Sequence, residues 1–516
     1  MQLFAHNNEV ERLDARLDTQ MAATGAPHTL DVLLPLAWHL RQRDTSRAVV
    51  LAEKVAQVLA AAGQDTAERA RGLARVQLIH AEAAWLAGDL DRAEALELAA
   101  RTAFGAVDDA VGVGDAHWLR VCLCVDRGNP KQRAVEAAHT VAAYASAGDQ
   151  QRRTMAVARG IYLNAFTDAA AARQEFIASG IADHAGGDPV VAAWVDAAAA
   201  RLASLANEFG KAARKYEQVH DAALQTGQVR QAIVGASGVC ATFLNLNNPS
   251  FALEWSERGL AMARAAGWPI LVGDLLANTG EVLHQLGHHD SAQAHLLDAL
   301  AVLAPVAGSG SHAGALKGLG EVALALRQDE SACSWFAQAE AAYRQLGWKD
   351  MLADVLRGRA EALARLDRQA EALALVDESL ALCREDGYRA KQIDLLRIAA
   401  GLHRRRSQTA AAGRETPLHF LNEALALADG IEGYNVPHAL LEEAAAEYAA
   451  QGDLDRAYRL ALQAGVSRQR VASKEAGNRA VALQVRYETE RIHAETEHHK
   501  QLAATEARRA DALLSA

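Results

Sequence analysis

The chain has 516 residues, of which 51% are hydrophobic but only 5% are aromatic, and its formal net charge is -11 with a pI near 6.0. This acidic balance provides no general basic field, which argues against binding to nucleic acid or to an anionic membrane through overall charge. Abundant alanine and only nine prolines favour closely packed helices, because alanine has the highest helix propensity.

The N-terminal segment gives no targeting signal. Residues Met1 to Arg12 are polar and acidic, unlike the basic start and apolar core of a signal peptide. No apolar run reaches the ~18 residues of a membrane span, since stretches such as Val190 to Ala206 contain Asp196 and Arg201. Five scattered cysteines suit a reducing compartment. We therefore expect a cytoplasmic protein without a membrane partner, in which residues 1–29 form an N-terminal helical cap.

Residues 30–466 repeat with a period of 40 residues. A small residue recurs at Gly160, Ala200, Cys240, Gly280, Gly320, Ala360 and Ala400. A second small residue keeps the same step at Ala172, Ala212, Ala252, Ala292, Ala332 and Ala372. Glycines that suit the left-handed residue after a helix stand at Gly227, Gly267, Gly347 and Gly387. These registers predict about eleven antiparallel helix pairs, with the small residues buried where helices cross.

The units resemble those of the tetratricopeptide (TPR) family, which pair a small residue in the first helix with a small and a bulky residue in the second. The inter-helix turn of that family is almost unaltered in two places, Gly88 to Ala93 and Gly452 to Ala457, which both read Gly-Asp-Leu-Asp-Arg-Ala. The period exceeds the family's usual ~34 residues and resembles longer variants in bacterial regulatory proteins. The resemblance implies an all-α solenoid whose first helices line a concave binding surface.

Charged residues also repeat with the unit on the expected first helices. The members of this charge ladder are Glu281, Glu321 and Glu361, with Lys317, Arg357 and Arg397. The spacing places Lys317 beside Glu321, and it places Arg357 beside Glu361 in the same way. Such pairs either only solubilise an exposed face or, with Asn278, His284 and Gln285, form a mixed-charge groove for an extended peptide or helix. In the second interpretation the basic side chains bind acidic groups of the partner.

Other motifs predict little chemistry. Gly308-Ser309-Gly310 follows a helix instead of a strand, so we interpret it as a loop and not as a phosphate site. His284 and His288 have the spacing of a metal pair, but Gly287 ends the helix between them, so we expect no metal site. The basic run Arg404 to Arg406 is interpreted as a solvated loop. Without a nucleophile, base and orienting group together, we expect no catalytic residues, no cofactor and no enzymatic activity.

The period stops before residues 467–516, which are charged and free of proline and therefore predict one long helix. This tail resembles the helical connector that follows TPR arrays in bacterial signalling proteins and leads to a diguanylate cyclase or another output domain. It offers a weak heptad seam at Val485, Thr489, Ile492, Thr496, His499, Ala503, Glu506, Ala510 and Leu513. We therefore expect a weak parallel homodimer through this helix.

Two classes of function remain open at the level of sequence. The first is a non-catalytic sensory module that binds a protein or peptide in its groove and signals through the tail to an output domain absent from this chain. The second is a stand-alone adaptor or scaffold whose tail only dimerises. The sensor region of a TPR-containing transcription activator is a further alternative.

Overall fold

The computed structural model describes residues 1–22, 30–61, 66–184, 187–385, 387–409, 416–431 and 434–514. These residues form helices joined by short turns and contain no strand, which confirms the expected all-α solenoid. No helix among them is both long enough and apolar enough to cross a membrane.

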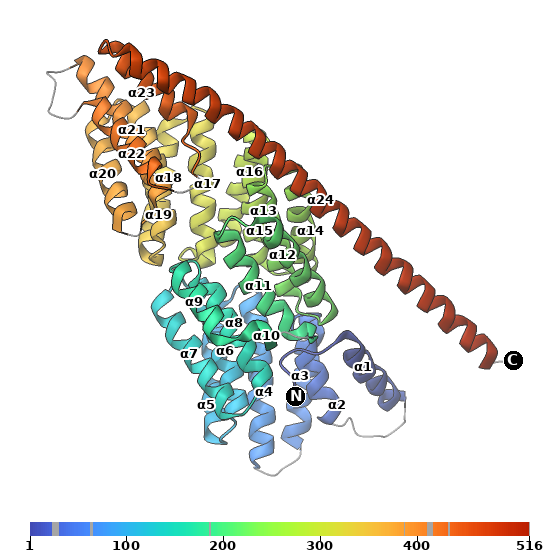
Figure 1. Ribbon diagram of the computed structural model, residues 1–516. Coiled ribbons are helices and arrows are strands. Elements are labelled where there is room, and N and C mark those ends of the chain that lie inside the picture. The colour runs from blue at the N-terminus through green and yellow to red at the C-terminus, as the bar shows by residue number, and fades with distance from the viewer. Residues whose placement is uncertain are drawn as a thin grey trace.

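Helix α1 (Asn7–Ala22) precedes an array in which consecutive helices pack in pairs (Figure 1). The first pairs are α2 (Leu30–Leu40) with α3 (Thr45–Ala61), α4 (Ala67–Leu86) with α5 (Leu90–Ala106), α6 (Ala110–Asp126) with α7 (Pro130–Ser146), and α8 (Gln150–Asn164) with α9 (Ala169–Ser179), followed by the short α10 (Ile181–His184). The next are α11 (Pro189–Leu205) with α12 (Phe209–Gln225), α13 (Val229–Asn245) with α14 (Pro249–Ala266), and α15 (Pro269–Gln285) with α16 (His289–Leu303), which leads into η1 (Ala304–Val306). The last are α17 (Gly310–Ala325) with α18 (Asp329–Leu346), α19 (Lys349–Arg365) with α20 (Gln369–Glu385), α21 (Arg389–Thr409) with α22 (Pro417–Asp429), and α23 (His438–Ala450) with the start of α24 (Leu454–Leu514).

The helices end where the 40-residue register places a left-handed residue. The expected glycines after second helices, Gly227, Gly267, Gly347 and Gly387, have φ angles between 61° and 74°. A second series lies in the turns within pairs, at Asn207, Asn247, Gly287, Arg327 and Asp367. Glycine adopts this region freely, and asparagine and aspartate tolerate it better than other residues, so the turn chemistry repeats with the unit.

The small residues Gly280, Gly320 and Ala360 of the register are buried at helix crossings, as predicted, whereas Gly160 is only half-buried and has open space beside it. A Cβ atom at Gly280 would lie 2.6 Å from Leu296 Cγ, and one at Gly320 would lie 2.6 Å from Phe336 Cε1. Ala360, at the same place in the next unit, is fully buried. Close packing of these helices therefore requires a side chain no larger than the one present.

The array winds back onto itself, so that units distant in sequence meet. Four contacts join residues about 180 positions apart, namely Arg43 with Gly227, Gly88 with Pro269, Gly128 with Gly308, and Phe166 with Trp348. The segment around Gly308 forms a turn before α17, as its composition predicts, and this turn contacts the array. Ser309 is buried and its hydroxyl accepts a hydrogen bond from His312 N as the N-cap of α17. Each superhelical turn thus contains between four and five helix pairs.

Helix α24 continues without a break from the last pair into the tail, and Figure 1 shows it running along the array and then away from it. Ala482 and Val485 are buried against the array in a cluster that contains Phe243 and Tyr216. The tail also touches α12, where a Cβ on Gly210 would lie 3.0 Å from Val481 Cγ1. Val485 is therefore used within its own chain, and its assignment to a dimer seam is wrong. The remaining seam positions, from Thr489 onward, lie outside the described side chains.

Candidate partner-binding groove

The eight residues predicted to form a binding groove all lie on first helices of their pairs. Helix α15 carries Asn278, Glu281 and His284; α17 carries Lys317 and Glu321; α19 carries Arg357 and Glu361; and α21 carries Arg397. The structure divides them into a group on α15 and α17, which holds two glutamates and one lysine, and an arginine-rich group on α19 and α21.

In the first group, Lys317 lies between two glutamates. Its Nζ atom is 2.7 Å from Glu321 Oε1. Burial alone would lower the pKa of Lys317, but the charges of Glu321 and Glu281 outweigh it and raise that pKa. The side chain of Glu281 is exposed by accessible area, but desolvation by the surrounding protein raises the pKa of its carboxyl, while Lys317 opposes the rise. Lys317 is therefore neutralised internally.

The two neutral members of the predicted groove make local contacts. The amide of Asn278 donates to Ser237 Oγ at 2.7 Å, which links α15 to α13. His284 Nδ1 lies 3.1 Å from the Nδ1 atom of His289, the first residue of α16. Burial lowers the pKa of His284, so this imidazole is neutral near pH 7. Neither residue lines the cavity that contains the second group.

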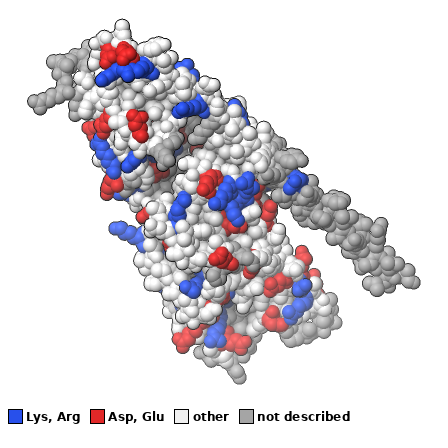
Figure 2. Space-filling view, in the orientation of Figure 1, with Lys and Arg blue, Asp and Glu red and all other residues white. Residues whose placement is uncertain are grey.

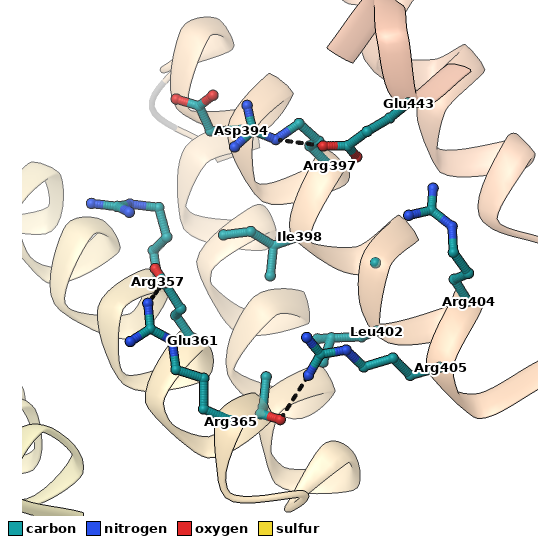
Figure 3. Close-up of a pocket in the computed structure, with 12 residues that line it drawn as sticks. Arg357, Glu361, Arg365, Asp394, Arg397, Ile398, Leu402, Arg404, Arg405 and Glu443 are labelled. Carbon is teal, nitrogen blue, oxygen red and sulfur yellow. Dashed lines mark hydrogen bonds and ion pairs between the residues drawn. The ribbon is translucent and has the colours of Figure 1, made fainter. Parts of the chain in front are cut away.

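The second group opens into a cavity of about 520 Å³ between α19, α21 and α23, shown in Figure 3. Three of the predicted residues meet there, Arg357, Glu361 and Arg397. Its other lining residues are Ala364, Arg365, Asp394, Ile398, Gly401, Leu402, Arg404, Arg405 and Glu443. Five arginines therefore share one cavity with three carboxylates and a small apolar floor.

Ion pairs tie the cavity walls together without using all of its arginines. Arg397 Nε is 3.5 Å from Glu443 Oε1, which links α21 to α23. Arg404 makes a second link of this kind, 2.5 Å from Glu447. Arg405 donates to the carbonyl of Ala364 at 3.1 Å. These contacts hold guanidinium groups at the rim of the cavity with hydrogen-bonding capacity to spare, since each guanidinium carries five N–H donors.

Two carboxylates of this cavity, neither of them fully buried, have raised pKa values. Burial raises the pKa of Asp394, against the lowering influence of Arg397 and Arg357. Burial likewise raises the pKa of Glu443, against Arg397 and Arg404. The arginines remain charged, so the lining carries two more arginines than carboxylates in a chain whose net charge is -11, while Glu447 and Asp329 pair with Arg404 and Arg365 from outside the lining. Figure 2 shows acidic and basic side chains intermixed over one face of the array, without a large area of one sign, so this excess is local.

The acidic half of the charge ladder ends inside this cavity. Gly401 occupies the place that Glu281, Glu321 and Glu361 hold in the preceding units. Arg397 therefore has no glutamate one turn later on its own helix. The absence of that side chain also leaves space between α19 and α21. Glycine in place of glutamate at position 401 thus removes one negative charge from the cavity and leaves its volume open.

Two of the sequence expectations need correction here. Glu361 pairs with Arg365, at 2.5 Å, and not with Arg357. The basic run expected as a solvated loop lies instead on α21, where Arg404 and Arg405 line the cavity. The step of 40 residues from Arg365 to Arg405 was the signal that placed both on the groove. The interpretation of the run as a solvated loop does not use this signal.

A second cavity, of about 220 Å³, lies where the superhelix meets itself. Its walls combine the aromatic rings of Phe166 and Trp348, stacked with centroids 5.3 Å apart, with polar groups that include Asp126 and Arg230. Asp126 accepts a hydrogen bond from Trp85 Nε1 at 2.6 Å, and burial raises the pKa of its carboxyl. None of the eight predicted residues lines this cavity.

No protein-family model matches the chain, and no curated protein matches it in sequence. Solved structures are similar in fold. A Rap protein complexed with competence and sporulation factor aligns at 11% identity over 70% of this chain and 99% of its own, with a TM-score of 0.50. The fold is TPR-like. The apo form of RapI aligns at 9% identity over 70% of this chain and 99% of its own, with a TM-score of 0.46.

Proposed function

We propose that this TPR-like array is a non-catalytic regulatory module that binds an acidic segment of a partner protein in the arginine-rich cavity of α19, α21 and α23. The observation that carries this proposal is the excess of five arginines over three carboxylates in one cavity. Arginine binds carboxylates through two parallel N–H···O bonds, and such charge-assisted bonds are about twice as strong as neutral ones.

The size and shape of the cavity suit a short stretch of peptide. About 520 Å³ falls within the range of ~300 to 1,000 Å³ for sites that bind compact ligands. Ile398 and Leu402 provide an apolar strip between the guanidinium groups. A segment with acidic side chains on both sides of an apolar one would match this lining. The Rap protein with a similar fold was crystallised with competence and sporulation factor, which supports a ligand-binding role for arrays of this shape.

A binding role also accounts better for the lining than catalysis does. Arginine stays protonated throughout the physiological range, so it cannot act as a general base or nucleophile. The cavity lining contains no serine, cysteine, histidine or lysine. We therefore propose that the chain acts through binding alone.

The tail offers a route by which binding is communicated. Arg397 and Arg404 hold Glu443 and Glu447 of α23, and α23 packs against the start of α24. An acidic ligand competes for the same arginines, loosens the link from α21 to α23, and so changes how α24 lies along the array. The helix then acts on an output domain, of which a diguanylate cyclase is one candidate, or on a second copy of the tail. A stand-alone adaptor is the alternative, in which ligand binding leaves α24 unchanged.

Charge reversal tests the proposed site. The double variant Arg357→Glu, Arg397→Glu should lose capture of acidic peptides in a pulldown while its helical circular dichroism stays unchanged. Arg12→Glu, an exposed reversal of the same charge on α1, is the matched control and should behave as the wild type. Undiminished capture by the double variant would exclude this cavity as the binding site. Hydrogen exchange of α24 with and without peptide separates the relay from the adaptor.

A further inference from the structure

Two imidazoles and one carboxylate converge between α6 and α7, away from the groove residues. His117 comes from α6, while Glu136 and His139 come from α7, one turn apart. One ligand atom from each of the three lies within 4.8 Å of the other two. Both imidazoles present Nδ1 to Glu136 Oε2, at 2.6 Å for His117 and 3.9 Å for His139.

We propose that His117, Glu136 and His139 form a binding site for a borderline divalent cation, of which Zn²⁺ is the best match. Two nitrogens and one oxygen are a ligand set that Zn²⁺ and Co²⁺ accept, whereas Mg²⁺ and Ca²⁺ require oxygen ligands. The three residues leave a fourth tetrahedral position for water or for a group from a partner.

The geometry needs only small adjustments to hold the ion. Ligand atoms at ~2.0 to 2.1 Å from a tetrahedral Zn²⁺ are about 3.3 Å from one another. The contact from His117 to Glu136 must therefore open by about 0.7 Å, and that from His139 must close by about 0.6 Å. The side chain of His139 is 56% exposed, so it has room to rotate toward the other two ligands. Its exposure also gives the ion a path from solvent.

Neighbouring groups support this ligand set. Gln132 donates its amide to Glu136 Oε1 at 2.6 Å, which fixes the carboxylate and directs the other oxygen toward the two imidazoles. Glu97 is fully buried nearby, and its Oε2 atom makes no hydrogen bond to a described group. Its other oxygen, Oε1, pairs with Arg101 Nε at 2.8 Å.

The sequence alone did not indicate this site. Glu136 and His139 have the Glu-x-x-His spacing that places two ligands on one helix face. The third ligand, however, lies 19 residues earlier on a different helix. A bound ion would join α6 to α7 at the outer side of the array, independently of the arginine-rich cavity.

Metal titration of the full chain, stripped of metal by a chelator, tests the proposal with ZnCl₂ and CoCl₂ as probes. Because the chain has 19 histidines, the decisive quantity is the difference between matched variants. The wild type should bind one Zn²⁺ more tightly than His139→Ala by at least ~10-fold, and Gln132→Ala should weaken the same site by ~10- to 100-fold. His295→Ala removes a histidine on α16 outside the cluster and should bind as the wild type.

Two further readouts distinguish ligation from a change in folding. Co²⁺ should give the visible absorbance of a tetrahedral site in the wild type and lose it in His139→Ala. Zn²⁺ should raise the thermal unfolding midpoint of the wild type but not that of His139→Ala, while the two metal-free proteins unfold alike. Equal Zn²⁺ affinity and equal Co²⁺ spectra for the wild type and His139→Ala would overturn the proposal.

Discussion

The ring of Phe336 fills the space between two glycines, and this packing gives a quantitative test of the repeat assignment. Phe336, on α18, is 1% exposed. A Cβ atom at Gly320 on α17 would lie 2.6 Å from Phe336 Cε1, and a Cβ atom at Gly358 on α19 would lie 2.5 Å from Phe336 Cζ. The substitution Gly320→Ala therefore forces the ring into a space that the neighbouring helix already limits.

The expected size of the effect follows from two opposing terms. Overpacking a core of this density costs ~1 to 3 kcal/mol. Replacing glycine by alanine inside a helix contributes about 1 kcal/mol of stability in the other direction. Gly160, at the same register position in α8, has no neighbour within 4 Å of a built Cβ atom, so Gly160→Ala gives only the favourable term. The two variants should thus differ in stability by the overpacking term, ~1 to 3 kcal/mol.

Urea unfolding monitored by circular dichroism measures this difference, and hydrogen exchange of α17 to α19 locates it. Gly160→Ala should unfold at a higher urea concentration than the wild type, and Gly320→Ala at a lower one than Gly160→Ala. Trimming the ring with Phe336→Leu should cost less in the Gly320→Ala background than in the wild type, because the two changes relieve one another. Equal midpoints for the two alanine variants, with no coupling to Phe336, would refute the proposed helix crossing.

Three further predictions address pH, the tail and the thiols. Burial, with the charges of Arg41 and Arg43, lowers the pKa of His39 to about 3 in the folded chain. In the unfolded chain this imidazole takes up a proton near pH 6.5. The contribution of His39 to the free energy of unfolding is therefore fully present above about pH 7 and has fallen by about 2 kcal/mol at pH 5. His39→Gln should flatten that dependence in urea titrations, and an unchanged slope would contradict it. Val485→Glu should detach α24 from the array and raise the exchange of tail amides, and unaltered exchange would mean that the tail is held elsewhere. Maleimide at pH 8 should label the half-buried Cys333 before the four buried thiols, and mass spectrometry showing another cysteine first would contradict that order.

The helix pairs and their turns were predictable because they depend on the size and backbone preference of residues close in sequence. Close packing against the next helix requires a small residue at Gly280 and Gly320, and the end of a helix favours glycine at Gly267. The repetition of both features every 40 residues predicts the fold class. The turns at Arg327 and Asp367 adopt the same left-handed backbone without glycine and so gave no comparable signal. Their position follows from the register of the surrounding units.

Features that depend on the accumulated geometry of many units were not predictable. The meeting of Gly128 with Gly308 requires the summed rotation of more than four pairs, which no local motif encodes. The docking of Val485 on the array has the same origin, and the heptad pattern alone assigned it to a partner helix. The charge ladder locates Arg357 and Arg397 at the cavity, whereas it misses Arg405, because a compact basic run is more typical of a solvated loop than of a helix that lines a groove.

The most direct test of the central claim is an unbiased selection of a random peptide library on the immobilised full chain, with the composition of the retained pool read by sequencing. Peptides rich in aspartate and glutamate should be enriched by the wild type and by Arg12→Glu. The double variant Arg357→Glu, Arg397→Glu should lose that enrichment, because it reverses two of the five arginines of the cavity. A wild-type pool without acidic enrichment, or an acidic pool retained equally by the double variant, would contradict the proposed function.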